Sequence, residues 1–226
     1  MERVVFSLGG SVFYNNGINF EFVEPFIQYL KRLDRKGAVV IGGGQVAREF
    51  IEAGRRLGLN EYECDLIAIQ ETRKNATLFL YAIRSEDVYP RVLKSAEEAG
   101  VAINHYRWLV SGGFFPGITT DAVATMVAEA IGAPKVINIS RVDGLYDKDP
   151  KRFKDAKKIK RAPIKEFLKI AVEGDQRKAG ENFVFDIIAL KIAQRSRIQL
   201  EFVPPNIEEI DKAVKGEPHI GTTLYP

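Results

Sequence analysis

The chain is poor in the residues that most often carry redox, metal and nucleophilic chemistry. Its 226 residues include one cysteine, Cys64, and two histidines, His105 and His219. A single cysteine cannot form a disulfide within the chain, so the fold must be held by a packed core, which a chain of this length can bury. Two histidines exclude a histidine-rich metal centre, and no Ser/His/Asp or Cys/His signature is present.

Long apolar runs and a strong net charge are also missing. No stretch approaches the roughly 20 consecutive apolar residues needed to cross a bilayer, and Met1–Ser7 leads into a strand-like V-V-F without a signal-peptide pattern. We therefore expect a cytoplasmic protein that does not enter a membrane, which also suits the lone cysteine. The 33 basic and 30 acidic residues give a net charge of +3, which is too small to indicate a nucleic-acid partner.

Basic residues are concentrated in one segment. Lys148–Lys165 holds nine basic and two acidic residues. Such a segment is either a solvated loop or a rim that attracts polyphosphate. It lacks interleaved aromatic residues beyond Phe153, so it does not favour binding to nucleic acid.

Apolar patterning predicts an α/β fold. Short β-branched or aromatic runs predict strands at Val4–Phe6, Ala38–Ile41, Tyr106–Val110, Lys135–Ile139 and Ile198–Val203, with a closing strand over His219–Tyr225. Helical spacing predicts helices that contain Phe22–Leu33, Val46–Leu57 and Val123–Ile131, with others over Leu66–Ile83, Arg91–Ala99, Ile164–Val172, Asp186–Arg195 and Glu208–Lys215. Most strand runs are continuously apolar, which is typical of a mainly parallel open sheet sandwiched between helices, a three-layer αβα architecture. No repeat or linker divides residues 1–226, so we expect one domain.

Two glycine loops follow the first two predicted strands directly. They are Ser7–Ser11, S-L-G-G-S, and Gly42–Gly44, which opens a helix. The carboxyl edge of an α/β sheet is where ligands bind, and consecutive glycines let backbone N–H groups approach phosphate oxygens. Neither loop matches a P-loop or a dinucleotide fingerprint. Arg48, one turn into the helix after Gly44, is either a surface arginine or a phosphate ligand.

Two further loops also follow predicted strands. In Ser111–Asp121, Thr119, Thr120 or Asp121 could cap the next helix, and the pair Phe114 and Phe115 forms either an apolar wall for a base or core packing. In the segment that begins at Ser140, Tyr146 could stack on a nucleobase and Asp149 could accept a bond from a ribose hydroxyl. The structural alternatives are hinge packing for Tyr146 and a cap before Pro150 for Asp149.

Taken in order, the four loops resemble the amino-acid kinase family, and specifically its archaeal-type uridylate kinases. The resemblance runs from Val4 to Thr223. Its most specific segments are S-L-G-G-S, G-G-G-Q-V-A-R, P-G-I-T-T-D-A-V-A, V-D-G-L-Y-D-K-D-P and a closing K-G-E with G-T-T.

The resemblance implies transfer of the γ-phosphoryl group of ATP to UMP, with Mg²⁺ as cofactor, in an enzyme of pyrimidine nucleotide biosynthesis. It implies an acceptor-binding half of about residues 1–132 and an ATP-binding half of about 133–226. The residues that match the phosphate-transfer site are Gly9, Gly10, Ser11 and Arg48. Those that match the ATP site are Gly9, Gly10, Gly44, Arg48, Ser140, Arg141, Tyr146 and Asp149. Those that match the UMP site are Gly43, Asp65, Phe114, Phe115, Pro116, Gly117, Ile118, Thr119 and Thr120. No protein metal ligand is implied.

Three departures from the family pattern bear on the function. Ser7 stands where many members carry a lysine that touches the transferring phosphate, Arg141 where an asparagine is usual, and Phe115 where histidine or glutamine is common. The candidates to replace the lysine are Arg48, Arg141, Lys178 and Lys191. Two alternatives therefore stay open: a kinase of the same fold for another small acid or phosphate, and a non-catalytic nucleotide- or oxyanion-binding storage or sensor protein.

Some expectations concern packing rather than chemistry. Trp108 and Cys64 are expected in the core, and His219 at the surface. The helix within Glu61–Ile83 has a wide apolar stripe, and the resemblance implies that it is buried between subunits of a homohexamer, a trimer of dimers.

Overall fold

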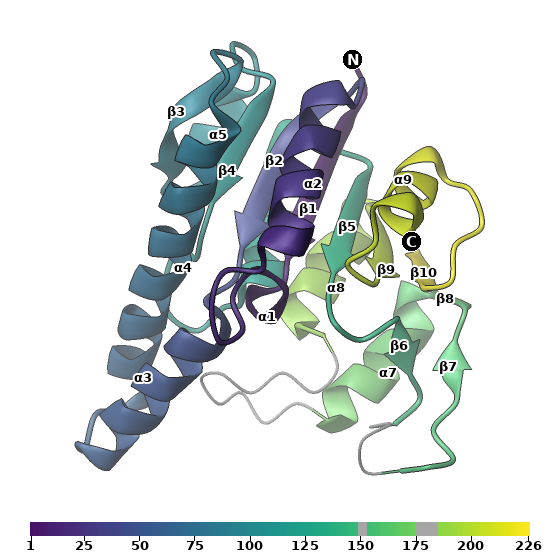
Figure 1. Cartoon of the computed structure of the whole chain (residues 1–226). Helices are drawn as coiled ribbons and strands as arrows, with labels where there is room; N and C mark the ends of the chain where they lie inside the picture. The colour runs from purple at the N-terminus through teal and green to yellow at the C-terminus, as the bar shows by residue number, and fades with distance from the viewer. Residues whose placement is uncertain (149–152, 175–184) are drawn as a thin grey trace.

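The computed structural model describes residues 1–148, 153–174 and 185–226. Its centre is an eight-stranded sheet with the strand order β3-β4-β2-β1-β5-β9-β10-β8 (Figure 1). The strands are β1 (Arg3–Leu8), β2 (Lys36–Ile41), β3 (Val88–Leu93), β4 (Trp108–Ser111), β5 (Lys135–Ile139), β8 (Arg161–Pro163), β9 (Gln199–Val203) and β10 (Thr222–Tyr225). Every neighbouring pair is parallel except β9 and β10. The expected mainly parallel open sheet is confirmed.

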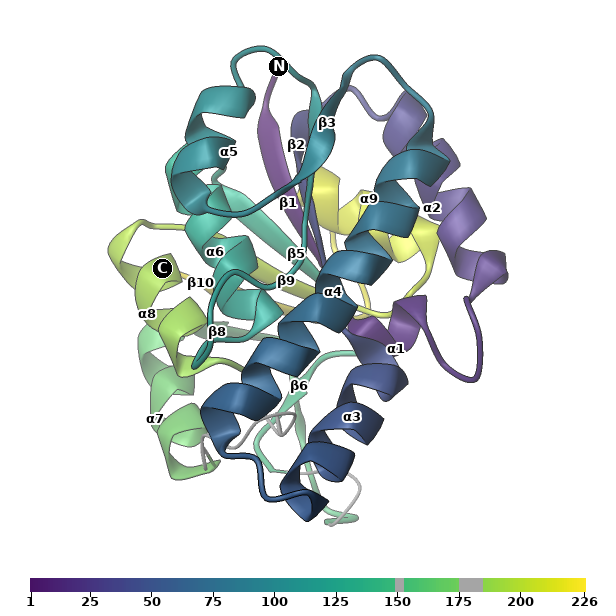
Figure 2. The same cartoon turned by 90° about the vertical axis from the view of Figure 1, so that its left-hand side faces the viewer.

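Helices cover both faces of this sheet (Figure 2). One face packs against α5 (Ala96–Ala102), α6 (Thr120–Ile131), α7 (Ile164–Gly174) and α8 (Ile187–Arg195). The other face packs against α1 (Gly10–Phe13), α2 (Phe20–Arg32), the second half of α4 (Glu61–Ile83) and α9 (Ile207–Lys215). Helix α3 (Gly44–Arg56) lies beside the first half of α4. In β1, Val5 faces the first set and Phe6 the second, because successive strand side chains point to opposite faces. The three-layer expectation is confirmed.

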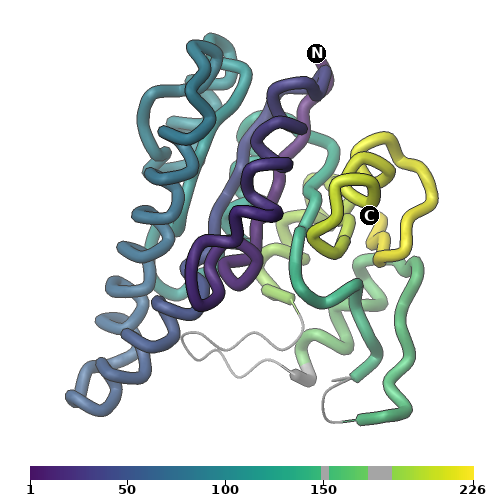
Figure 3. Tube along the Cα trace, in the orientation of Figure 1, coloured from purple at the N-terminus to yellow at the C-terminus, as the bar shows by residue number. Residues whose placement is uncertain are grey.

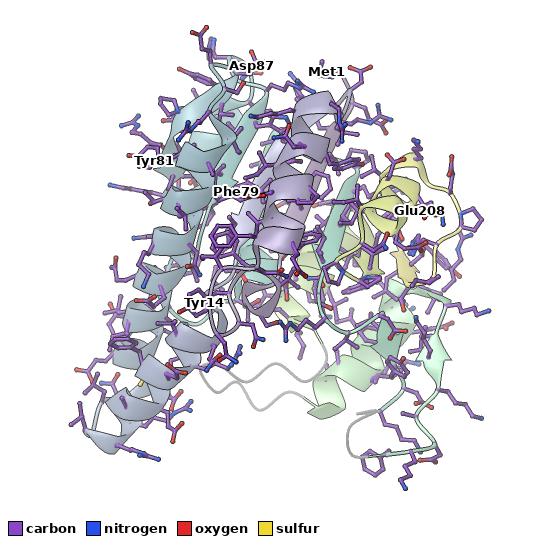
Figure 4. All side chains as sticks on the ribbon, viewed as in Figure 1. Met1, Tyr14, Phe79, Tyr81, Asp87 and Glu208 are labelled. Carbon is purple, nitrogen blue, oxygen red and sulfur yellow. The ribbon has the colours of Figure 1, made fainter. Side chains whose placement is uncertain are left out.

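Aromatic side chains fill the layer between β1 and the helices α2 and α4. The ring of Phe26 lies 5.4 Å from Phe6 and 6.1 Å from Phe79. Figure 4 shows Phe79 pointing from α4 towards α2, and Tyr81, two residues later, pointing away into solvent. Trp108 is buried next to Phe6, as expected. Burial of these large rings supplies much of the hydrophobic stabilisation on this face.

The predicted helix over Arg91–Ala99 is wrong. Residues 88–93 form β3, an edge strand, and α5 begins only at Ala96, where the Ser95 side chain accepts from the Glu98 N–H. Val88 and Val92 are β-branched, and Pro90 lacks the N–H that a central strand would need, so the segment suits a sheet edge. The short strands β6 (Leu145–Tyr146), β7 (Lys158–Ile159) and β8 were not predicted.

The expectation that His219 lies at the surface is wrong. Its side chain is only 4% exposed, and Nε2 lies 3.0 Å from Oε2 of the buried Glu201 on β9. The carboxylate also accepts from the Thr223 hydroxyl. Burial pushes the pKa of Glu201 up, but the bonds from His219, Thr223 and Gln199 outweigh it and leave this pKa below its ordinary value.

Candidate active site

The four predicted loops lie at one edge of the sheet, because β1, β2, β4 and β5 are parallel neighbours in it. Figure 3 traces the chain from the N-terminus down β1 to this edge. The loop after β1 touches both of its neighbours: the Gly9 N–H donates to the Ile139 carbonyl at the end of β5, and the Gly42 N–H donates to the Leu8 carbonyl. The sheet therefore brings the phosphate-loop candidates together.

The two glycine loops pack backbone against backbone. A Cβ atom on Gly10 would lie 2.0 Å from the Gly44 nitrogen, and Gly44 itself has a φ of +74°. Side chains are excluded at both positions, because one would overlap a main-chain atom and the other would be strained. From α4, the Asn75 amide donates to the carbonyls of Gly42 and Gly43 at 3.0 and 3.3 Å and fixes the second loop. The loops offer main-chain N–H groups beside the start of α3, the arrangement that favours anions.

The remaining phosphate-site predictions fall beside these loops. Ser11 is in α1, one residue after Gly10. Arg48 lies exposed on the first turns of α3, the helix that begins at Gly44 of the second glycine loop. Lys191 is exposed on α8. Lys178, another candidate for the missing cation, lies outside the described residues, as does Asp149.

Helix α4 holds the loop that follows β4 through three side chains, Asp65, Thr72 and Arg73, which we call the loop clamp. Asp65 Oδ2 accepts from the Gly117 N–H at 2.8 Å. Thr72 Oγ1 accepts from the Gly113 N–H at 2.7 Å. Arg73 donates to the carbonyls of Gly113 and Phe114 at 3.1 and 2.9 Å. Asp65, grouped with this loop by resemblance, is therefore bonded to it.

The two phenylalanines of this loop differ. Phe114 is buried in the core beside α6, whereas Phe115 is half exposed. Core packing thus describes Phe114, and an accessible apolar wall is available only from Phe115. Thr119 is the N-cap of α6, with its side chain accepting from the Ala122 N–H, so the capping prediction is confirmed for this residue. Its own N–H donates to Asp186, which caps α8.

A polar group that was not predicted as a site lies where β1, β5 and α6 meet. Asp121 Oδ1 accepts from the Ser7 hydroxyl and from the Asn138 amide, both at 2.7 Å. Burial raises the pKa of Asp121 to about 6, the bonds from Ser7 and Asn138 work against this shift, and the charge of Asp186 adds to it. Ser7 thus ties the start of the first glycine loop to a carboxyl group whose pKa burial raises above its ordinary value.

The loop after β5 is held by three polar side chains, Asp143, Tyr146 and Lys158, which we call the tyrosine latch. The Tyr146 hydroxyl donates to Asp143 Oδ1 at 2.8 Å, and Lys158 Nζ lies 2.9 Å from Asp143 Oδ2. Partial burial pushes the pKa of Asp143 up, but Lys158 and Tyr146 outweigh it and hold this pKa below its ordinary value. Ser140 donates to the Val142 carbonyl within the same loop.

Arg141 leaves this loop and crosses to the turn after α1. With the Asn15 amide oxygen turned towards it, the guanidinium donates to that oxygen from Nη2 at 2.9 Å and from Nη1 at 3.2 Å. The side chain is exposed. Arg141, one of the four candidates to replace the missing lysine, is thus hydrogen-bonded between two loops at this edge of the sheet.

Several site side chains were missed by sequence reasoning: Thr72, Arg73, Asn75, Asp121, Asn138, Asp143, Lys158 and Asp186. No local signal singled out Thr72, Arg73 and Asn75, because they lie in a mostly polar stretch of the helix, Gln70–Thr77. Across the described part of the chain, no three His, Cys, Asp or Glu side chains are grouped to hold a metal. Nor does any helix in those residues have the length and apolar character to span a membrane.

Comparisons with known proteins agree with this geometry. The model of the amino acid kinase family matches residues 2–203. A uridylate kinase of Methanocaldococcus jannaschii is 39% identical over 95% of this chain and 96% of its own length, and one of Archaeoglobus fulgidus is 41% identical over 98% and 99%. The crystal structure of uridylate kinase from A. fulgidus superposes with a TM-score of 0.85 at 39% identity, covering 99% of this chain and 100% of that one. That of a UMP kinase from Bacillus anthracis, at 20% identity, has a TM-score of 0.79 and shares the fold.

Proposed function

Because this chain belongs to the amino acid kinase family, we propose that it is a uridylate kinase, which transfers the γ-phosphoryl group of ATP to UMP and releases ADP and UDP. The observation that carries the proposal is the similarity to uridylate kinases along nearly the whole chain. The loop clamp adds physical support, since it joins Asp65 to the loop expected to bind UMP. The pathway served is pyrimidine nucleotide biosynthesis, in the cytoplasm.

On the acceptor side, the proposed UMP site consists of Gly43, Asp65 and residues 114–120. The Gly117 N–H already occupies one carboxylate oxygen of Asp65, and the other is available to accept from the ribose hydroxyls of UMP. The half-exposed Phe115 ring offers an apolar surface to a base. Arg73 contributes by fixing the carbonyls of the same loop.

On the donor side, the proposed phosphate ligands are Gly9, Gly10, Ser11, Gly44 and Arg48. Main-chain N–H groups at the start of α3 favour anionic oxygens, and the Arg48 guanidinium can pair with a phosphate in two-point geometry. The adenosine part lies against Ser140, Arg141, Tyr146 and Asp149. The Tyr146 ring, positioned by the tyrosine latch, is the stacking surface there.

The chemistry requires little beyond positioning and charge neutralisation. The nucleophile is a phosphate oxygen of UMP, which is already an anion, so no general base is needed. The two glycine loops meet where the phosphates of donor and acceptor would face each other, and their rigid contact favours in-line approach. The single His–Glu pair in the described residues is buried away from these loops, between β9 and β10.

A magnesium ion suits the carboxylates beside these loops. The bonds of Asp121 come from two neutral donors, and within residues 1–148, 153–174 and 185–226 no lysine or arginine pairs with it. Mg²⁺ prefers oxygen ligands and is held by one or two carboxylates together with phosphates. Asp121, with Asp186 near it, would hold the ion, which when bound neutralises charge on the transferring group.

The proposed enzyme is a homo-oligomer, a hexamer made of three dimers. Helices α3 and α4 expose apolar side chains along the part of the molecule away from the sheet, and Tyr81 is seen pointing outwards in Figure 4. These residues are Phe50, Leu57, Tyr62, Leu66, Leu78 and Tyr81. An apolar surface of this kind on two adjacent helices suits contact with a second copy of the chain. Light scattering of the purified protein measures its mass directly.

A coupled assay of ADP release tests the activity. ATP and Mg²⁺ are supplied with UMP, CMP, AMP, GMP, acetylglutamate or isopentenyl phosphate in parallel reactions. We expect turnover with UMP, little with AMP or GMP, and a loss of about 100-fold in Arg48→Ala. Arg56→Ala, which replaces an exposed arginine of the same helix that pairs with the exposed Glu52, is the matched control and should keep full activity.

A second function, a non-catalytic nucleotide-binding protein, is favoured by one observation. Ser7 stands where, by the resemblance, many family members carry a lysine, and its hydroxyl donates to Asp121. If ATP binds saturably in calorimetry while no acceptor is phosphorylated, this second function replaces the first. Turnover with acetylglutamate or isopentenyl phosphate, but not UMP, would instead assign the chain to another kinase activity of the fold.

A further inference from the structure

Lys158 joins three segments that are distant in sequence. It comes from β7, which pairs with β6 below the end of β8 and β10 in Figure 1. Its Nζ lies 2.9 Å from Asp143 Oδ2 in the loop after β5, and 2.6 Å from the carbonyl oxygen of Ile220 in the turn before β10. The lysine side chain is 21% exposed, although its neighbours Lys157 and Lys160 are exposed residues. Its ammonium is therefore turned inwards and bonded.

The backbone at Gly144 leaves room for the Lys158 side chain. Gly144 has a φ of +151°, and a Cβ atom there would lie 2.6 Å from Lys158 Cε and 2.7 Å from Thr222 Oγ1. Only glycine fits both the conformation and the space. The same threonine oxygen accepts from the Leu145 N–H at 2.8 Å. The turn at Gly144 is thus packed directly on the stem of Lys158.

The far end of the contact is anchored in the main fold. Ile220, whose carbonyl receives the ammonium, donates its own N–H to Glu209 Oε2 on α9 at 2.7 Å. The preceding residue is His219, which is bonded to the buried Glu201 on β9. The turn that contains His219 and Ile220 is therefore held by α9 and by β9. Because Lys158 bonds both the Ile220 carbonyl and Asp143, it holds Asp143 in place relative to this turn.

Asp143 in turn restricts the orientation of the Tyr146 ring. One of its oxygens receives Lys158, and the other accepts from the Tyr146 hydroxyl at 2.8 Å. A ring held by its hydroxyl has fewer orientations available, so less conformational entropy is lost when a base stacks on it. Charged partners make such hydrogen bonds stronger than neutral ones.

We propose that Lys158 is a positioning residue for the donor nucleotide, which acts through Asp143 to hold the Tyr146 ring against the base. This rests on the proposed function, in which Tyr146 lies in the adenosine site. Lys158 has no part in the UMP site, because the loop clamp comes from α4 and its loop from β4. The effect of losing it is therefore confined to ATP.

The test is the kinetics of Lys158→Met, with Lys157→Met as the control that removes the same charge from the adjacent exposed position. We expect the KM for ATP to rise about tenfold in Lys158→Met, with kcat and the KM for UMP changed less than about twofold. Tyr146→Phe should raise the KM for ATP similarly, and the double variant should be no worse than about twofold beyond either single one. A purely structural lysine would lower Tm without separating the two KM values.

The proposal is overturned if Lys158→Met matches Lys157→Met, or if the KM for UMP rises as much as that for ATP. If Lys158→Met does not fold, Asp143→Asn carries the same prediction.

Calorimetric ATP binding, measured without UMP, separates this proposal from the proposed kinase activity. Wild-type protein that binds ATP but phosphorylates nothing contradicts the kinase function only, and the affinity ratio of wild type to Lys158→Met still decides the role of the lysine. Wild-type protein that binds no ATP contradicts both.

Discussion

The loops on the two sides of the active site are held by different physical means. The loop clamp comes from α4, a helix of 23 residues, and its Thr72 is buried against the loop that it bonds. The tyrosine latch is built on the two-residue strands β6 and β7, and its Asp143 and Lys158 are partly exposed. One loop is held by three side chains of a long helix, of which Thr72 is buried, and the other by a partly exposed ion pair beside short strands.

This difference decides how each side should respond to change. Leaving a buried main-chain carbonyl unpaired lowers the stability of the whole fold, because the carbonyl loses its water without gaining a partner. Breaking an ion pair that water reaches lowers stability little, since water replaces the lost partner. We therefore expect acceptor-side variants to lose both stability and UMP affinity, and donor-side variants to lose ATP affinity alone.

The largest effect is expected at Gly10, where the two glycine loops of the proposed phosphate site touch. In Gly10→Ala the new Cβ would lie 2.0 Å from the Gly44 nitrogen, so the two glycine loops must separate. Misplacement by about 1 Å at a reacting centre can lower the rate about 100-fold, and we expect at least that loss of kcat, with a lower Tm. Both are measured by the ADP-release assay and calorimetry.

The control for this variant is Gly100→Ala in α5. A Cβ there would lie 3.4 Å from the Ala130 carbonyl oxygen, an ordinary contact, and alanine is favoured over glycine within a helix. Gly100→Ala should keep full activity and be equally or more stable. Wild-type kcat in Gly10→Ala would show that the loops do not need their close contact.

Asp121 lies between the two sides, and its substitution should raise stability while it lowers activity. Its folded pKa is about 6, raised from 3.8, so the folded state disfavours the ionised carboxylate. Stability is therefore lost as pH rises from about 4 through 6, by up to about 3 kcal/mol. Asp121→Asn removes this charge, keeps an oxygen for Ser7 and Asn138, and should raise Tm at pH 8 while lowering kcat about 100-fold.

Thermal unfolding of wild type and Asp121→Asn between pH 4 and pH 8 measures the first effect, and the coupled assay the second. The difference in Tm between the two proteins should be small at pH 4 and grow with rising pH. A constant difference over this range would contradict the raised pKa. An unchanged kcat would remove Asp121 from the proposed chemistry.

A smaller effect, confined to the acceptor side, is expected from Arg73→Met. The substitution leaves the carbonyls of Gly113 and Phe114 without their donor. We expect the KM for UMP to rise about tenfold and Tm to fall by about 3 °C, with the KM for ATP unchanged. Arg56→Met, at an exposed position on α3, is the control. A rise in the KM for ATP would remove the distinction between the two sides.

The sequence predicted what depends on local pattern. Short β-branched or aromatic runs identified β1, β2, β4, β5 and β9, and glycine pairs identified the loop edge. Edge and short strands have no such pattern: β3 contains Pro90, and β6 and β7 have two residues each. Contacts between residues distant in the chain could not be predicted either. Nothing in the sequence near Lys158 indicates that its ammonium bonds the carbonyl of Ile220, 62 residues away. The resemblance grouped Asp65 with its loop, but only the fold supplied the bond.

The smallest effect is expected at Arg141, one of the three residues that depart from the pattern of the family that this chain resembles. Its guanidinium is exposed and bonds the Asn15 amide oxygen, and a solvated contact of this kind contributes little. Arg141→Asn should change the KM for ATP by less than about threefold, and the preference for ATP over GTP should be kept, because the tyrosine latch that positions Tyr146 is untouched. Kinetics with each donor at saturating UMP measure both quantities. A tenfold change, or a shift of preference towards GTP, would mean that the donor side depends on Arg141 and not on the latch.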